Sequence, residues 1–167
     1  MNYAYLATPI GTLLIAGDVS AVHRITFPQH GRAAKPEPEW QESRRGPVGE
    51  TMLQLREYFA GKRAAFDLPL APDGTAFQRS VWRQLQEIPY GETISYGELA
   101  RRVGNPKASR AVGSANGANP LPIVIPCHRV IASDGTLGGF GGGLPIKQML
   151  LDLELRASVA NRAVASR

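Results

Sequence analysis

Apolar and polar residues alternate in short runs over the first third of the chain, with the period of about two that is typical of half-buried β-strands. The runs are NYAYLAT from Asn2, GTLLIAG from Gly11 and VHRITF from Val22. Turn-forming residues separate them, namely Pro9, Gly11, Gly17 and Asp18. Because short strands joined by tight turns pair antiparallel, this pattern predicts a small β-meander.

A helical spacing follows a polar stretch. Residues 28–47 are rich in proline, glycine and charge, which indicates a loop. Met52, Leu55, Tyr58 and Phe59 then recur at helical intervals, and Gly61 ends the pattern. Residues 61–74 indicate a connection to a second unit, so we expect two domains, 1–72 and 73–167.

The second unit begins with another helical pattern. Phe77, Val81, Leu85 and Ile88 fall on one face, and we expect Pro89 to stop the helix.

A pair of short helices is predicted next. Ser95 can cap a helix that runs to Val103. After a turn at Gly104, we expect a second helix with Asn105 as its cap and Pro106 as its first residue. The pair predicts a helix-turn-helix, although many helical hairpins bind nothing.

The second of these helices has an unusual composition. Apart from Lys107, Arg110 and Val112, its side chains are small. A thin helix could enter a DNA minor groove, which is about 6 Å wide, but close helix–helix packing would explain small residues equally well.

Composition and charge narrow the class of protein. The chain has 167 residues, of which 43% are hydrophobic, enough to form a core. A single cysteine cannot form an internal disulfide, which favours a reducing, cytoplasmic location. Because the first residues lack a basic segment followed by a long apolar run, we expect no signal peptide, and no stretch approaches the roughly 20 apolar residues of a membrane span.

Positive charge is concentrated in the second unit. Residues 1–72 hold 8 Lys and Arg against 7 Asp and Glu, whereas residues 73–167 hold 11 against 7. Between Thr93 and Ile131 the only acid is Glu98. The bases of this segment are Arg101, Arg102, Lys107, Arg110 and Arg129. Such a segment suits a polyanion, and a solvated surface is the alternative.

The only cysteine, Cys127, is followed directly by His128 in the stretch PIVIPCHRVI. A thiolate is a strong nucleophile, and a nearby base raises its population. A histidine base usually needs a third group to orient it, and Glu154 in the last helical pattern is our candidate. Adjacent side chains often diverge, however, and cysteine is commonly just a small buried hydrophobe.

Long segments around Cys127 resemble the O6-alkylguanine-DNA alkyltransferases, also called methylated-DNA–protein-cysteine methyltransferases. IPCHRV at Ile125–Val130 looks like their active-site signature. The resemblance extends over FQRSVWRQLQEIPYGETISYGELARRVGNPKASRAVGSANGANPLPIVIPCHRVI and GTLGGFGGGLPIKQMLLDLE, roughly half the chain. The first 70 residues are similar only in being rich in strands.

The resemblance implies an α+β fold, with a small RNase H-like N-terminal domain around the meander and a mostly helical C-terminal domain containing the helix-turn-helix. It implies that the protein binds the minor groove of double-stranded DNA and flips out a nucleotide. Cys127 would then take the alkyl group from O6-alkylguanine irreversibly, so that one molecule performs one repair. No cofactor and no membrane is implied, and the protein would act as a monomer. O4-alkylthymine as a second substrate and cooperative clustering on DNA stay open.

The resemblance also implies roles for individual residues. His128 would take the thiol proton through a water molecule, and Glu154 would orient His128. Asn119 would tie the helix-turn-helix to the active-site segment. Tyr96 would help to rotate the target phosphate and protonate the departing guanine. On the residues alone, Asn119 could be an ordinary turn residue and Tyr96 a core aromatic.

Arg110 matches the family's finger residue, which enters the base stack in place of guanine, although alone it could be a phosphate contact or a solvated arginine. The other expected DNA contacts are Lys107, Ala108, Ser109, Ala111, Gly113 and Ser114. The expected substrate pocket comprises Pro122, Val130, Phe140 and Gly141. Phe140 stands where some members have tyrosine, and the glycine-rich loop 138–143 suggests a pocket roomy enough for alkyl groups larger than methyl.

No metal site is expected. The chain has no cysteine before Cys127, and His23 and His30 alone cannot complete a tetrahedral zinc site. Two other functions are compatible with the residues. One is a DNA-lesion binder or regulator with a structural Cys127, and the other is a hydrolase using a Cys-His-Glu set.

Overall fold

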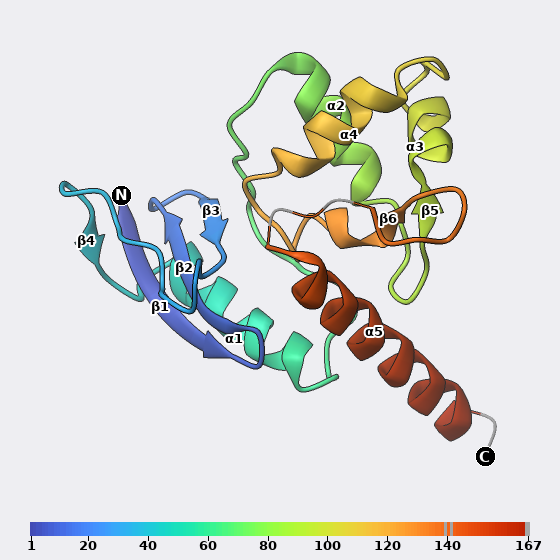
Figure 1. Cartoon of the computed structure of the whole chain (residues 1–167). Coiled ribbons are helices and arrows are strands. Elements are labelled where there is room, and N and C mark those ends of the chain that lie inside the picture. Colours follow the sequence, from blue (N-terminus) through green and yellow to red (C-terminus); the bar gives the residue numbers. More distant parts are fainter. Residues whose placement is uncertain (139, 141, 166–167) are drawn as a thin grey trace. The chain divides into compact units, whose positions relative to one another are not determined.

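The computed structural model describes residues 1–138, 140 and 142–165, and the chain divides into two compact units, Met1–Asp73 and Gly74–Arg167. Figure 1 shows a sheet-containing first unit, drawn in blue to teal, and a mainly helical second unit. This is the α+β class expected from the sequence.

The first unit contains the predicted meander. Strands β1 (Asn2–Thr8), β2 (Gly11–Gly17) and β3 (Val22–Thr26) pair antiparallel, with Thr8 opposite Gly11 at the first hairpin. A short strand, β4 (Gln41–Glu42), lies parallel to β1 and gives the order β3-β2-β1-β4. The prediction of a loop throughout 28–47 is therefore wrong at β4. The exposed edge of β1 offers backbone hydrogen-bond partners to this polar segment, and the Gln41 amide donates to the Met1 carbonyl at 2.9 Å.

One helix packs against this sheet. Helix α1 (Pro47–Phe59) begins with proline in its first turn, where no backbone donor is needed. It buries Met52, Leu55 and Tyr58, as the spacing predicts, and contacts β1 and β2 (Figure 1). Gly61 follows in the left-handed region, at φ 73°, which ends the helix.

The second unit opens with α2 (Ala76–Leu85), where the Thr75 side chain and Gln78 form a reciprocal capping box. Val81 and Leu85, on the predicted apolar face, are buried, whereas Phe77 at the start of the helix is 38% exposed. The helix ends at Leu85 rather than at Pro89, because the chain tightens there and the Ile88 amide donates to the Leu85 carbonyl. Ile88 is still buried, outside the helix.

The next two helices form the helix-turn-helix. Helix α3 (Tyr96–Arg102) has the predicted cap, since the Ser95 hydroxyl accepts from the Glu98 amide. Helix α4 (Ser109–Gly117) packs against α3 and α2 but starts three residues later than predicted. Pro106 instead occupies a turn closed by the Ala108 amide and the Asn105 carbonyl, at 3.0 Å, a position that suits proline as well as a helix start does.

The remaining elements surround the cysteine. A 3₁₀ turn, η1 (Cys127–Arg129), leads into β6 (Val130–Ile131), which pairs parallel with β5 (Ile94–Ser95) just before α3. The last helix is α5 (Leu144–Ala165) (Figure 1). No helix in the described ranges is long and apolar enough to span a bilayer.

Candidate active site

Cys127 lies at the start of η1 and is only 5% exposed. The whole segment 121–130 is buried, so the apolar run around the cysteine serves as core. The Cys127 amide donates to the Ile125 carbonyl at 2.8 Å, which tightens the chain directly before the thiol. The backbone of the nucleophile is thus fixed by packing and by its own turn.

Asn119 holds the loop that precedes this turn. Its amide nitrogen donates to the Ile125 carbonyl at 2.7 Å, and its oxygen accepts from the Leu121 amide at 2.9 Å. Within the loop, Ile123 has a left-handed backbone at φ 75°, which is unfavourable for a β-branched residue. Asn119 therefore closes a strained loop between α4 and Cys127.

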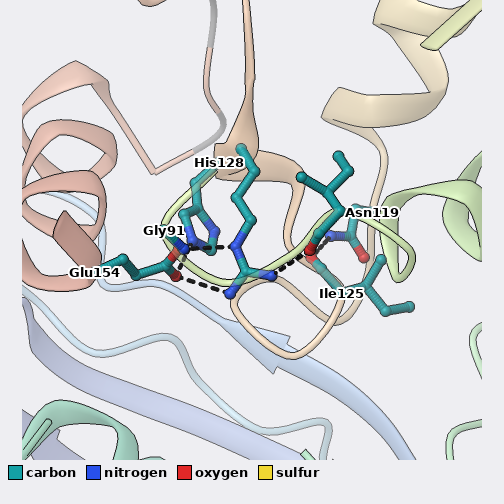
Figure 2. A network of polar contacts seen from close by, with 7 residues as sticks. Gly91, Asn119, Ile125, His128 and Glu154 are labelled. Carbon is teal, nitrogen blue, oxygen red and sulfur yellow. Dashed lines mark hydrogen bonds and ion pairs between the residues drawn. The ribbon is translucent and has the colours of Figure 1, made fainter. Parts of the chain in front are cut away.

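His128 and Glu154 form a buried pair. Nε2 of His128 lies 2.6 Å from Oε2 of Glu154, and their side chains are 0% and 1% exposed. In Figure 2 the Glu154 carboxylate, from α5, faces His128 and the backbone of Gly91, whose amide donates to Oε1 at 3.3 Å. Gly91 permits this approach, since its φ is 80° and a Cβ there would collide with Ser158.

Arg129 is the second partner of the same carboxylate. Its Nε donates to Oε1 of Glu154 at 2.8 Å and its Nη2 to Oε2 at 3.1 Å. Its Nη1 donates to the Ile88 carbonyl at 2.7 Å. Counting Arg129 among cations available to a polyanion was therefore wrong. Its position inside the apolar run PIVIPCHRVI is the signal that could have indicated burial.

The pKa values of the pair follow from these contacts. Burial raises the pKa of Glu154, but hydrogen bonds and charge from His128 and Arg129 outweigh it and lower the pKa to about 2. Burial lowers the pKa of His128, and the Glu154 contact opposes that shift only in part. An ionised Glu154 accepts from a neutral His128, so Nε2 carries the proton and Nδ1 is left as an acceptor. Nδ1 has no hydrogen-bond partner among the residues that the structure describes.

The resting thiol of Cys127 is uncharged. Burial raises its pKa to about 11, while a hydrogen bond from Asn119 and the charge of Lys147 act in the opposite direction. The thiol therefore needs a base at the moment of attack, because the free thiolate is scarce at neutral pH.

Lys147, from α5, was missed from the sequence. It is fully buried, and its Nζ donates to the Val130 carbonyl at 2.6 Å and to the Leu137 carbonyl. The same ammonium lies 5.9 Å from the ring centre of Tyr96 and 6.0 Å from that of Phe140. One cation thus links the loop after the cysteine with two of the predicted site residues. A lone lysine in a helical pattern gives no sequence signal for this role.

Tyr96 is the first residue of α3 and lies near Cys127. Burial, and then the neighbouring Cys127, raise the pKa of its phenol, so it is a proton donor rather than a phenolate. Gly138, at φ 71°, allows the loop to approach, because a Cβ there would lie 2.9 Å from the Tyr96 hydroxyl.

The predicted pocket is only partly described. Pro122 and Val130 are buried and Phe140 is half-buried. Gly141 lies outside the described residues, as does Gly139, and the predicted room in the pocket for alkyl groups larger than methyl falls on that undescribed part of the loop.

A direct link from α4 to Cys127 was also missed. Nδ2 of Asn116 donates to the Cys127 carbonyl at 3.3 Å, and Oδ1 of this buried side chain has no partner in the described part of the chain. One turn of α4 thereby touches the backbone of the nucleophile.

The opposite face of α4 is exposed. Val112, Ala115 and Asn116 point inward. The outward residues of α4 are Ser109, Arg110, Ala111 and Ser114, with Gly113 half-buried; just before the helix, Lys107 is exposed and Ala108 is half-buried. Arg101 and Arg102 of α3 both bind Glu98, whereas Lys107 and Arg110 have no ion-pair partner within the described ranges.

This architecture defines a class of protein: a buried cysteine with a histidine–carboxylate pair, attached directly to a helix-turn-helix. Comparison with known families agrees. The family model "6-O-methylguanine DNA methyltransferase, DNA binding domain" matches residues 76–156, and the "ribonuclease-like domain" of the same family matches residues 1–72. The chain belongs to the 6-O-methylguanine DNA methyltransferase family.

Individual relatives cover nearly the whole chain. A methylated-DNA–protein-cysteine methyltransferase of Methanosarcina acetivorans is 49% identical over 92% of this chain and 98% of its own length. One from Haemophilus influenzae is 48% identical over 92% of this chain and 86% of its own. The crystal structure of Mycobacterium tuberculosis OGT in complex with DNA matches with a TM-score of 0.86 and 43% identity, over 94% of both chains.

Proposed function

We propose that this protein repairs DNA by transferring an alkyl group from O6-alkylguanine in duplex DNA to Cys127. The observation that carries the proposal is the coupling of a buried Cys-His-Glu set to a helix-turn-helix by Asn119, in a chain of this family. The related M. tuberculosis OGT is known in complex with DNA, which supports DNA as the partner.

The proposed reaction begins with the thiol proton. His128 accepts it at Nδ1, directly or through one water, while Nε2–H stays bonded to Glu154. The Cys127 sulfur then attacks the alkyl carbon, the bond from that carbon to O6 breaks, and a thioether forms. Since water does not readily cleave a thioether, each molecule acts once.

Tyr96 and Arg110 have separate tasks in this proposal. The phenol of Tyr96, held un-ionised beside the cysteine, gives a proton to the departing guanine and limits the charge on it. Arg110, exposed at the start of α4, fills the gap left by the flipped nucleotide, where its planar guanidinium can stack and form hydrogen bonds. The small exposed residues of α4 let the helix approach the minor groove.

The mass of the intact protein tests the proposal. After incubation with duplex DNA carrying O6-methylguanine, we expect a gain of one methyl group per molecule, and no gain for Cys127→Ala. Tight DNA binding with no change in mass would favour a non-catalytic lesion binder instead. Repeated turnover would favour a cysteine hydrolase.

We also propose where the protein acts. With a single reduced cysteine as its acceptor, the protein is suited to a reducing compartment with access to DNA, and we propose the cytoplasm.

A further inference from the structure

The Arg129 guanidinium uses all three of its nitrogens inside the second unit. Nε and Nη2 meet the two oxygens of Glu154 in a bidentate pair, and Nη1 binds the Ile88 carbonyl. The guanidinium carbon lies 5.6 Å from the ring centre of Tyr90. Because Arg129 is only 5% exposed, these contacts are shielded from water.

The Glu154 carboxylate therefore binds two side chains at once. Arg129 is permanently charged, whereas His128 is charged only when it is protonated. Resting on the proposed function, we infer that Arg129 is a positioning residue that keeps Glu154 ionised and keeps His128 neutral, and so available to take the proton of Cys127.

The charges around His128 support this inference. Among the residues that the structure describes, Glu154 on α5 is the facing group that favours the imidazolium, while Arg129 on the same turn and Lys147 on α5 both disfavour it. Cys127 is an uncharged thiol at rest, and Tyr96 is un-ionised. A buried Glu154 with His128 as its only cationic partner would stabilise the imidazolium, which cannot accept a proton.

Lysine could not do the same. A bidentate pair plus a third bond to the Ile88 carbonyl requires a planar fork of donors, and an ammonium is a single charged point. Arg129→Lys would keep the charge near His128 but lose the fixed orientation of the carboxylate. Arg129→Gln would lose both.

Two measurements on the full chain test the inference. The first follows the ring protons of His128 by NMR against pH, without DNA. The second measures the rate of alkyl transfer to Cys127 from free O6-benzylguanine against pH, in wild type, Arg129→Gln and Arg129→Lys. Arg156→Gln, an exposed arginine on the same helix as Glu154, is the matched control.

We expect His128 of wild type to titrate below the ordinary value of 6.5, and to titrate at higher pH in Arg129→Gln. The loss of rate in Arg129→Gln should then be at least about tenfold larger at pH 6 than at pH 9, as protonated His128 accumulates. Arg129→Lys should lose rate by a similar factor at every pH, with little movement of the His128 titration. Arg156→Gln should match wild type.

Other outcomes overturn the inference. If His128 of wild type titrates above pH 6.5, the inference is overturned. This test needs no variant, so it still applies if Arg129→Gln does not fold. A folded Arg129→Gln with an unchanged His128 titration and a uniform loss of rate would mean that Arg129 only holds the fold. If wild type gains no methyl group even from duplex DNA carrying O6-methylguanine, the proposed function fails, while the NMR titration still decides the role of Arg129.

Discussion

The surroundings of Cys127 must keep its thiol protonated at rest and still allow a thiolate to form for attack. Burial keeps the thiol protonated, which protects a nucleophile that, in the proposed reaction, acts only once. Attack nevertheless requires a thiolate, and the groups that favour one are Asn119, Lys147 and the backbone amides of the turn. The reaction therefore depends on a small, local set of polar groups within a site that is otherwise apolar.

Lys147 is the member of this set that acts by charge. Lys147→Met keeps the length of the side chain but removes the cation and leaves the Val130 and Leu137 carbonyls without this donor. We expect alkyl transfer from free O6-benzylguanine to slow by about 10–100-fold, with the rate rising at higher pH than in wild type, because the thiolate loses its counter-charge.

The control for this prediction is Lys147→Arg, which keeps the charge and should retain more of the rate. An equal loss in both variants, with an unmoved pH profile, would show that Lys147 acts only through the two carbonyls. Single-turnover rates measured by intact mass provide the comparison.

Sequence reasoning reached the chemically distinctive residues of the site and missed the common ones. Cys127 is unique in the chain, His128 is adjacent to it, and a third group for the histidine was sought among carboxylates. Arg129 and Lys147 were not predicted, because arginine and lysine are usually solvated and their types alone do not reveal burial. The fold decides which cations turn inward.

At the scale of elements, the loop from α4 to η1 stores backbone strain. Ile123 is 1% exposed and lies at φ 75°, between the two backbone groups that Asn119 binds. A left-handed conformation costs a residue with a Cβ about 1–2 kcal/mol. Burial of the isoleucine side chain and the Asn119 clamp must outweigh that cost.

The strain can be measured by comparing two truncations at position 123. Ile123→Ala and Ile123→Gly both remove the buried side chain, but only glycine tolerates the backbone angle freely. We expect the glycine variant to have the higher free energy of unfolding, by about 1 kcal/mol, in urea titrations.

Val112 provides the matched pair of controls, since it is equally buried but lies within α4. There the alanine variant should be the more stable by about 1 kcal/mol, because glycine is unfavourable in a helix. The same order at both positions would contradict the strain at Ile123.

Element types were easier to predict than their ends. The meander, α1 and the Ser95 cap followed from periodicity and capping residues. The late start of α4 and the early end of α2 did not, because turns at Pro106 and at Ile88 satisfy the same local preferences as a longer helix. Strand β4 depends on the edge of β1, a partner far away in the sequence.

For the molecule as a whole, the number of basic residues overstates how many are free to contact DNA. Residues 73–167 carry +4 of the net charge of +5. Yet Arg101 and Arg102 bind Glu98, and Arg129 is buried against Glu154. Lys107, in the turn before α4, and Arg110, on the exposed face of α4, are exposed, so a few phosphate contacts, and not a broad basic surface, would carry the salt dependence of DNA binding.

The buried polar network also links stability to pH. The pKa of Glu154 is about 2 in the folded protein against an ordinary 4.5, so its contribution to stability is complete above about pH 4.5 and is lost as the pH falls toward 2. The lowered pKa of His128 has the same sign, since the unfolded chain gains a proton first as the pH drops through 6.5. Both groups therefore make the folded protein less stable at acidic pH.

Glu154→Gln should remove the lower part of this dependence. Glutamine cannot ionise, so we expect the difference in unfolding free energy between wild type and Glu154→Gln to be largest near pH 7 and to narrow as the pH falls from about 4.5. Urea unfolding of the full chain at several pH values measures it, with Asp152→Asn, an exposed carboxylate on the same helix, as control. A constant difference across pH 3 to 7 would show that Glu154 stabilises the unit by packing and neutral hydrogen bonds, and the ionised pair with Arg129 would then have to be abandoned.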